Sequence, residues 1–189
     1  KDSPNHWQAR KEKVASQILF HDADLVGVQE ALHRQVADMK TMLPGYGFAG
    51  VGRDDGREAG EYSGIFFNSQ KLQLLESATF WLSLTPAVPG SKSWDAAITR
   101  VVTWAKFKSK KDGKVFYHFN THFDHMGQEA RRQSAHLLLQ NVKAIAGNTP
   151  AVITGDFNAQ PTDEPIRIIT DTANPLHLTD SQALSATGH

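Results

Sequence analysis

The chain has 189 residues, of which 40% are hydrophobic and 21% are charged, as in a single globular domain rather than a disordered segment. It has no cysteine, which excludes disulfide frameworks, thiol catalysis and cysteine-ligated metal sites, and no apolar run approaches the roughly 20 residues of a membrane-spanning helix. The 20 basic and 20 acidic residues cancel, which disfavours a protein that coats duplex DNA through a basic surface.

The first part of the chain predicts a helix, a strand and a second helix. Apolar residues gather roughly on one face of a helix over 7–20, where Trp7, Val14, Ile18 and Leu19 are expected to face inward. The short apolar run 24–30 is typical of a buried strand. Apolar residues at three- and four-residue spacing then predict a helix over 31–43, which ends before a Pro-Gly pair.

The middle of the chain is predicted to be β-structure. Aromatic and branched residues indicate three strands, over 62–67, 72–82 and 101–107. A turn at 110–114 leads into a partner strand over 115–120, and the proline- and serine-containing stretch 84–95 is expected to form a surface loop.

The last part returns to alternating helix and strand. The strongest helix is predicted over 128–146 with Gly147 as its C-cap, a buried strand follows at 151–154, and Pro165 suits the first turn of a short helix. The whole order predicts one α/β domain over residues 1–189 with a largely antiparallel middle.

Polar side chains follow three of the predicted strands, and these are the candidate site residues: Glu30, then His122, Asp124 and His125, then Asp156 and Asn158. Such strand ends in an α/β protein meet at one rim, where ligands commonly bind. Oxygen ligands suit a hard cation, Mg²⁺ or Mn²⁺, rather than zinc. Magnesium usually completes its coordination with water and phosphate oxygens, so phosphoryl chemistry is expected.

Each of these residues also has a purely structural interpretation. Glu30 precedes a predicted helix, whose dipole favours a carboxylate there. Asp156 and Asn158 are residues that a tight turn tolerates, and a lone histidine is usually a satisfied core or surface group. The occurrence of all three clusters in order argues against coincidence.

Four segments carry a resemblance to a known family: Asp24-Leu25-Val26-Gly27-Val28-Gln29-Glu30, Glu61-Tyr62-Ser63-Gly64-Ile65-Phe66-Phe67, Asn120-Thr121-His122-Phe123-Asp124-His125 and Thr154-Gly155-Asp156-Phe157-Asn158-Ala159. Together they resemble the endonuclease/exonuclease/phosphatase superfamily, the group of deoxyribonuclease I. A bacterial subgroup of unassigned substrate is similar also in Ser3-Pro4-Asn5 and around Arg100.

The resemblance implies a four-layer α/β/β/α sandwich of two mixed, largely antiparallel sheets with outer helices. It also implies roles for five residues: Glu30 binds the metal, His122 contacts the scissile phosphate or assists the leaving group, Glu61 orients this histidine, Asp156 positions or activates the attacking water, and Asn158 holds the phosphate. Arg100 matches an arginine that reaches phosphate in nuclease-like members, or is a solvated strand residue. Asp124 and His125 either line the same rim or make structural hydrogen bonds.

Two expected family features are missing from the 189 residues. The family begins with a strand that ends in a metal-binding asparagine, and it ends with a strand followed by an Asp-His pair. After Asn158 the histidines are His177 and His189, and neither follows an aspartate. We expect the full protein to be longer and to supply the first and last strands; the alternative is an inactive fragment.

The expected function is that of a Mg²⁺- or Mn²⁺-dependent phosphoesterase, a phosphodiesterase or phosphomonoesterase in which water attacks phosphorus in line with the leaving oxygen. One alternative is a nuclease acting on DNA or RNA, and another is a catalytically inactive module that binds a phosphorylated ligand. The expected partner is a phosphoester substrate, either a small molecule, a lipid head group or an oligonucleotide. We expect a monomer with no stable protein partner.

Overall fold

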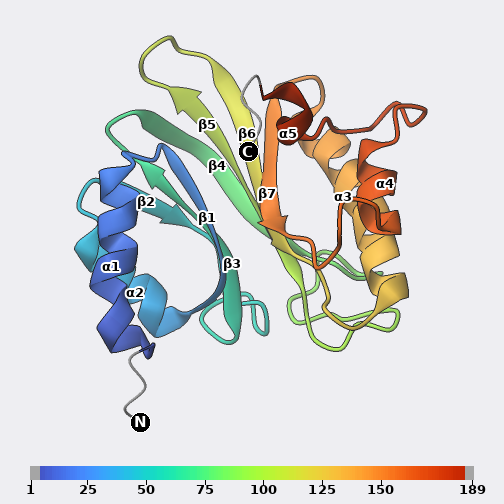
Figure 1. Ribbon diagram of the computed structural model, residues 1–189, viewed down its shortest axis with the longest axis horizontal. Coiled ribbons are helices and arrows are strands. Elements are labelled where there is room, and N and C mark those ends of the chain that lie inside the picture. Colours follow the sequence, from blue (N-terminus) through green and yellow to red (C-terminus); the bar gives the residue numbers. More distant parts are fainter. Residues whose placement is uncertain (1–4, 186–189) are drawn as a thin grey trace.

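The computed structural model describes residues 5–185, in which seven strands form two sheets that pack face to face. The strands are β1 (Leu25–Leu32), β2 (Tyr46–Ala49), β3 (Glu61–Asn68), β4 (Leu72–Trp81), β5 (Val101–Ser109), β6 (Val115–His122) and β7 (Ala151–Asp156). The helices are α1 (Trp7–Phe20), α2 (His33–Met42), α3 (Gln128–Ala146), α4 (Glu164–Thr170) and α5 (Ser181–Leu184). Helices α1 and α2 cover the outer face of one sheet, and α3 and α4 cover the outer face of the other (Figure 1). The predicted four-layer sandwich is confirmed.

The first sheet has the order β1-β3-β2, and both of its pairings are antiparallel. The second sheet has the order β4-β5-β6-β7, in which only the β6–β7 pairing is parallel within the described residues. That parallel pairing requires a crossover, and α3 provides it. The consequence for the site is that β6 and β7 end at the same edge, with His122 opposite Asp156 in the register.

Three apolar clusters hold the four layers together. One lies between the two sheets and includes Ile65 and Phe107, one packs the first sheet against α1 and α2, and one packs the second sheet against α3. The sheets approach closely at Gly27, where an added Cβ atom would lie 2.4 Å from Asn120 Oδ1 and 2.6 Å from Thr154 Oγ1. Only a residue without a side chain fits at this crossing.

The structure corrects several details of the sequence prediction. Strand β2 was missed, since four residues are too few for a clear pattern. Strand β1 does not end at Glu30 but continues to Leu32. In α1 the inward residues are Ala15 and Ile18, whereas Val14 and Leu19 are exposed. The predicted helix over 128–146, its Gly147 C-cap and the short helix around Pro165 are confirmed.

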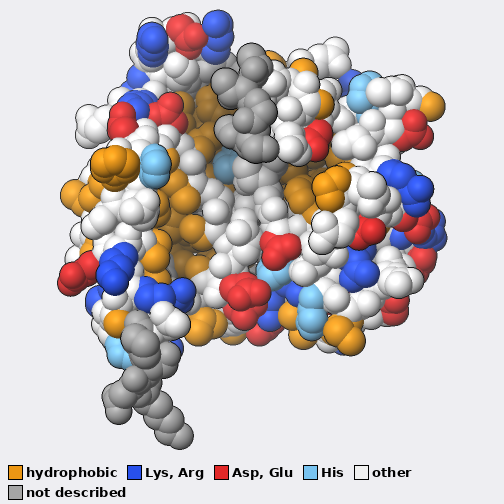
Figure 2. All heavy atoms as spheres, in the orientation of Figure 1, with side chains coloured by type: hydrophobic (Ala, Val, Ile, Leu, Met, Phe, Trp, Pro, Cys, Tyr) orange, Lys and Arg blue, Asp and Glu red, His pale blue; other side chains and the backbone are white. Residues whose placement is uncertain are grey.

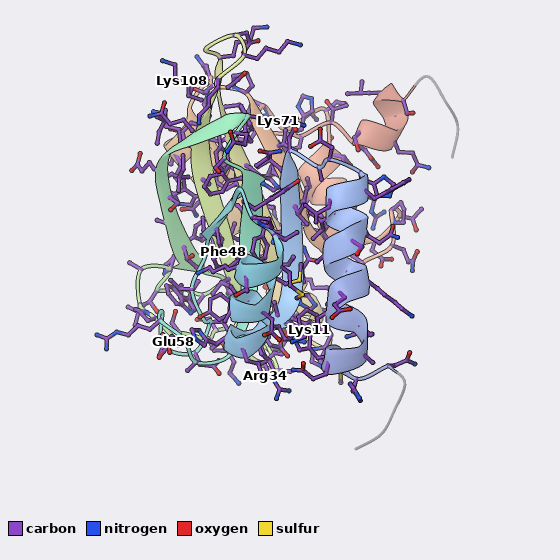
Figure 3. All side chains as sticks on the ribbon, turned by 90° about the vertical axis from the view of Figure 1, so that its left-hand side faces the viewer. Lys11, Arg34, Phe48, Glu58, Lys71 and Lys108 are labelled. Carbon is purple, nitrogen blue, oxygen red and sulfur yellow. The ribbon has the colours of Figure 1, made fainter. Side chains whose placement is uncertain are left out.

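Figure 3 shows the two ends of the sandwich: Lys71 and Lys108 lie at one end, and Arg34 and Glu58 lie at the other. Within residues 5–185, no helix is long and apolar enough to cross a membrane. Ser3, Pro4 and His189, which the sequence analysis singled out, lie outside the described residues.

Candidate active site

His122 and Asp156 meet where the parallel strands β6 and β7 end. The ring nitrogen Nε2 of His122 lies 3.6 Å from Oδ2 of Asp156, and the two strand ends are further tied by a hydrogen bond from the backbone N–H of Phe123 to the carbonyl of Asp156. His122 is buried and the Asp156 carboxylate is half exposed. The predicted meeting of these two side chains is therefore confirmed.

Glu30 enters this edge from the other sheet through a bulge in β1. The register of β1 against β3 shifts between Val28 and Ala31, and Glu30 has a φ of 58°, a strained conformation for a residue other than glycine. The residue before it is fixed across the sandwich, because Gln29 Nε2 donates to Asn120 Oδ1 at 2.8 Å. Asn120 in turn donates to the carbonyl oxygens of Val28 and Gly64. The bulge places an exposed carboxylate at the rim and holds its backbone rigidly.

The candidate residues form one electrostatic cluster. Burial lowers the pKa of His122, and the charge of Arg100 lowers it further, while Asp156, Glu30 and Glu61 raise it by a smaller amount. The lowered pKa favours a neutral imidazole near neutral pH. In the space-filling view, acidic, basic and histidine side chains gather in the lower middle of the face, below the end of β7 (Figure 2).

Arg100 lies beneath this cluster and is 4% exposed. Its Nη2 is 3.0 Å from Nδ1 of His125, and its Nε is 3.7 Å from Oδ2 of Asp124. The Nε and Nη1 atoms are buried without a hydrogen-bond partner. Burial, followed by the charge of Arg53, lowers the pKa of Arg100. Buried guanidinium N–H groups without an acceptor are costly, and an anion bound beside the guanidinium would offset its positive charge.

The carboxylate of Asp124 is bound by backbone N–H groups. It accepts hydrogen bonds from the N–H groups of Ala97, Ile98, Met126 and Gly127, at distances of 2.8 to 3.3 Å. This pattern ties the loop before β5 to the loop before α3. The structural interpretation of Asp124 is therefore the one that its contacts support.

Asn158 also makes structural bonds at the rim. Its Nδ2 donates to the carbonyl of Phe123 at 2.9 Å, and its backbone N–H donates to Oδ1 of Asp156 at 2.8 Å. Its φ of 47° lies in the left-handed region that asparagine tolerates. Asn158 thus orients the Asp156 carboxylate, and its expected contact with phosphate stays a prediction.

Glu61 pairs with a residue that the sequence analysis missed. Its carboxylate accepts a hydrogen bond from Nη1 of Arg53, so its expected contact with His122 stays a prediction. Arg53 lies in the loop between β2 and β3, and its Nε is buried without a hydrogen-bond partner. The sequence signal for this residue is weak: a loop rich in glycine and charge between two strands.

The donor set at the rim bears on whether a metal could bind. Within residues 5–185, no three His, Asp or Glu side chains are arranged to hold a metal ion together. Glu30 nevertheless offers an exposed carboxylate within electrostatic reach of Arg100 and His122. Magnesium is commonly held by one or two carboxylates, with water and substrate phosphate completing its shell. The residues present fit that kind of site and not a closed structural one.

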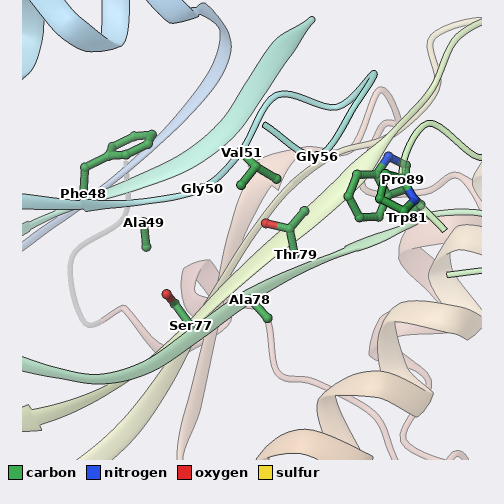
Figure 4. A pocket seen from close by; sticks show the side chains of 10 residues that line it. All are labelled: Phe48, Ala49, Gly50, Val51, Gly56, Ser77, Ala78, Thr79, Trp81 and Pro89. Atoms are coloured by element: carbon green, nitrogen blue, oxygen red, sulfur yellow. The ribbon is translucent and has the colours of Figure 1, made fainter. Parts of the chain in front are cut away.

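A separate cavity of about 440 Å³ lies between the edge strands β2 and β4, and the loop that carries Arg53 forms part of its wall (Figure 4). Its walls are formed by apolar, glycine and hydroxyl residues, among them Phe48, Val51, Thr79 and Trp81. No titratable acid, base or histidine lines it. Its chemistry does not suit catalysis, and the strand-end cluster remains the candidate active site.

Comparison with known proteins agrees with the fold. The sequence model of the endonuclease/exonuclease/phosphatase family matches residues 1–185. The chain belongs to this family. Among characterised proteins it is 27% identical to Nocturnin of Drosophila melanogaster over 176 residues, which are 85% of this chain and 25% of the fly protein.

Two solved structures are particularly similar. An endonuclease/exonuclease/phosphatase from Bacteroides vulgatus is 48% identical with a TM-score of 0.94, over 98% of this chain and 70% of that one. A protein from Bacteroides thetaiotaomicron described as a mannosyl-6-phosphatase is 43% identical with a TM-score of 0.84, over 87% of this chain and 62% of that one. The chain therefore spans between 25% and 70% of the length of these three relatives.

Proposed function

We propose that this protein hydrolyses phosphate esters by attack of water on phosphorus, assisted by a divalent metal ion. The observation that carries the proposal is the position of Arg100, a buried guanidinium with two unpartnered nitrogen atoms, under a rim that also holds His122, Asp156 and Glu30. A cation without a full set of acceptors beside a histidine and two carboxylates suits a phosphate group and the chemistry of its hydrolysis.

The residues divide the work as follows. The neutral imidazole of His122 donates its N–H to a phosphate oxygen, and Arg100 neutralises charge that develops on the phosphoryl group. The Asp156 carboxylate, held at Oδ1 by the N–H of Asn158, orients the attacking water and accepts its proton. The bond from water oxygen to phosphorus forms as the bond to the leaving alkoxide breaks, and the alkoxide takes up a proton from solvent.

Glu30 would hold the metal ion, Mg²⁺ or Mn²⁺. When bound, such an ion polarises phosphate oxygens and stabilises the leaving oxygen. The similarity to a Bacteroides thetaiotaomicron protein described as a mannosyl-6-phosphatase supports hydrolysis of a small phosphoester. The balanced net charge of the chain also favours a small substrate over long duplex DNA.

The test uses the full-length protein with p-nitrophenyl phosphate, bis(p-nitrophenyl) phosphate and mannose 6-phosphate, each in Mg²⁺, in Mn²⁺ and in EDTA. We expect metal-dependent release of p-nitrophenol or phosphate. His122→Gln and Asp156→Asn should each lower kcat by about 10²- to 10⁴-fold while the far-UV circular dichroism is unchanged. The matched control is His136→Gln, at an exposed position on α3, which should retain full activity. Full activity in both rim variants would refute the assignment.

A further inference from the structure

Arg53 is built into the rim in the same way as Arg100. Its backbone N–H donates to the carbonyl of Glu61, and its carbonyl accepts from Nε1 of Trp81 at 2.6 Å. Its side chain is 14% exposed, its Nη1 donates to Glu61, and its Nε lies 3.8 Å from Oδ1 of Asp54, beyond hydrogen-bond distance. Arg53 is therefore fixed at both its backbone and its side chain, and its buried Nε has no acceptor among the described residues.

Arg53 and Arg100 lie close enough to repel each other. After burial, the charge of Arg53 is the largest cause of the lowered pKa of Arg100. Arg53 pairs with the carboxylates of Glu61 and Asp54, and Arg100 lies within ion-pair distance of Asp124. Even so, three N–H-bearing nitrogen atoms of the pair remain buried without an acceptor. The chain segments that carry them are joined, because Thr99 Oγ1, next to Arg100, donates to Asp54 Oδ1, next to Arg53, at 2.8 Å. An anion bound near both guanidinium groups would offset their mutual repulsion.

The loop that carries Arg53 is braced from behind, so the arginine is held before any ligand arrives. Close packing leaves no room for a Cβ atom at Gly60, against the Asp54 side chain, or at Gly90, against the carbonyl of Asp54. Gly56 packs tightly against Pro89 and Trp81, with 3.2 Å from an added Cβ to the nearest atoms. Thr99 Oγ1 also donates to Asp54 Oδ1 at 2.8 Å. This packing resists movement of the loop, which lowers the ordering cost of binding.

We propose that Arg53 and Arg100 together form a seat for a dianionic phosphate group, and that the substrate class is therefore the phosphate monoester rather than the diester. This inference rests on the proposed function and deepens it. A monoester carries close to two negative charges at pH 7, because its second pKa is about 6, whereas a diester carries one. Guanidinium groups bind phosphate oxygens in pairs of parallel hydrogen bonds, so two arginines match the greater charge and number of free oxygens of the monoester.

The decisive variant is Arg53→Gln in the full-length protein, which removes the guanidinium group and its charge. The matched control is Arg57→Gln, the same change at an exposed position of the same loop. We would measure kcat/KM for p-nitrophenyl phosphate and for bis(p-nitrophenyl) phosphate, together with the affinity for inorganic phosphate by titration calorimetry. In Arg53→Gln we expect about a 100-fold loss on the monoester, at most about a 10-fold loss on the diester, and phosphate binding weaker by at least about 10-fold. Arg57→Gln should match the wild type in all three.

A monoester-to-diester ratio that is unchanged in Arg53→Gln would overturn the proposal. If that variant does not fold, as judged by circular dichroism, Arg53→Lys replaces it: the charge is kept, the paired donors are lost, and the ratio should fall by about 10-fold. An unchanged ratio there overturns the proposal as well. If the wild type cleaves no ester, but its phosphate binding is lost in Arg53→Gln, the proposed function is wrong and the phosphate seat is retained. If the wild type is active, but Arg53→Gln behaves like Arg57→Gln, the proposed function is retained and the phosphate seat is wrong.

Discussion

Asp124 joins two loops at the rim, and replacing it by Asn should destabilise the protein by an amount that can be worked out from its surroundings. The carboxylate is 1% exposed and accepts four backbone N–H groups. Burial alone would raise the pKa of Asp124, but these hydrogen bonds outweigh it and lower the pKa from 3.8 to about 2. Each pKa unit is worth about 1.4 kcal/mol, so ionisation contributes on the order of 2 kcal/mol to the free energy of unfolding.

The sign of the pH dependence follows from the direction of that shift. Because the pKa of the folded state lies below that of the unfolded state, the contribution is complete above about pH 4 and is lost as the pH falls towards 2. In Asp124→Asn the amide NH₂ group faces N–H donors and Arg100 loses its neighbouring charge. We therefore expect a loss of about 2–4 kcal/mol at pH 7 and a much smaller difference near pH 2.

The assay is urea denaturation of the wild type and the variant, followed by tryptophan fluorescence at several pH values. Asp112→Asn is the control, because hydrogen bonds from Ser109 and Lys114 also lower the pKa of Asp112 to about 2, but in an exposed hairpin turn. Water replaces those bonds, so the midpoint of Asp112→Asn should scarcely move. If the two variants lost the same stability, the argument from the buried loop junction would be wrong.

Two further predictions concern the buried layer between the sheets. His118 is 1% exposed, and burial lowers its pKa to about 4. Between pH 6.5 and pH 4 the imidazole is therefore protonated in the unfolded chain but neutral in the native state, which lowers the free energy of unfolding as the pH falls. The decrease in unfolding free energy from pH 7 to pH 4 should be about 3 kcal/mol smaller in His118→Gln than in the wild type. Identical pH profiles would contradict this. Gly27→Ala should lower the free energy of unfolding by about 1–3 kcal/mol, because the added Cβ would collide with Asn120 and Thr154. Thermal denaturation measures this loss. An unchanged Tm would contradict the prediction and mean that the two sheets can move apart at this point without a loss of stability.

The sequence was sufficient for the parts of the fold that repeat a hydrophobic period. The helix over 128–146 and the strands leading to His122 and Asp156 are long enough for their apolar pattern to be clear, and parallel pairing then brings the two strand ends together. The four-residue strand β2 gives no such pattern. The bulge at Glu30 cannot be predicted from the sequence for another reason. The positive φ of this single residue depends on the register of β1 against β3, and the sequence of β1 alone does not determine that register.

Arg53 could not be found from the sequence because its role depends on contacts that are distant along the chain. Its loop is held by Trp81, and its charge acts on Arg100, 47 positions further on. Asp124 shows the opposite case. The sequence allowed two interpretations of Asp124, a contact with substrate or a set of structural hydrogen bonds. The four N–H groups that bind it belong to two loops that are brought together only when the chain folds.

Several residues at the rim adopt conformations or environments that lower the stability of the folded protein. The backbone of Glu30 is strained, the histidine is kept neutral by burial and by a neighbouring cation, and two arginines retain N–H groups without acceptors. Each of these costs folding free energy, and none improves the packing of the three apolar clusters. Such costs persist where the surrounding structure fixes them, here through Gln29, Asn120, the braced loop and Asp124. A bound phosphate dianion would relieve the arginine terms together, so phosphate should raise the stability of the wild type and raise that of Arg53→Gln much less.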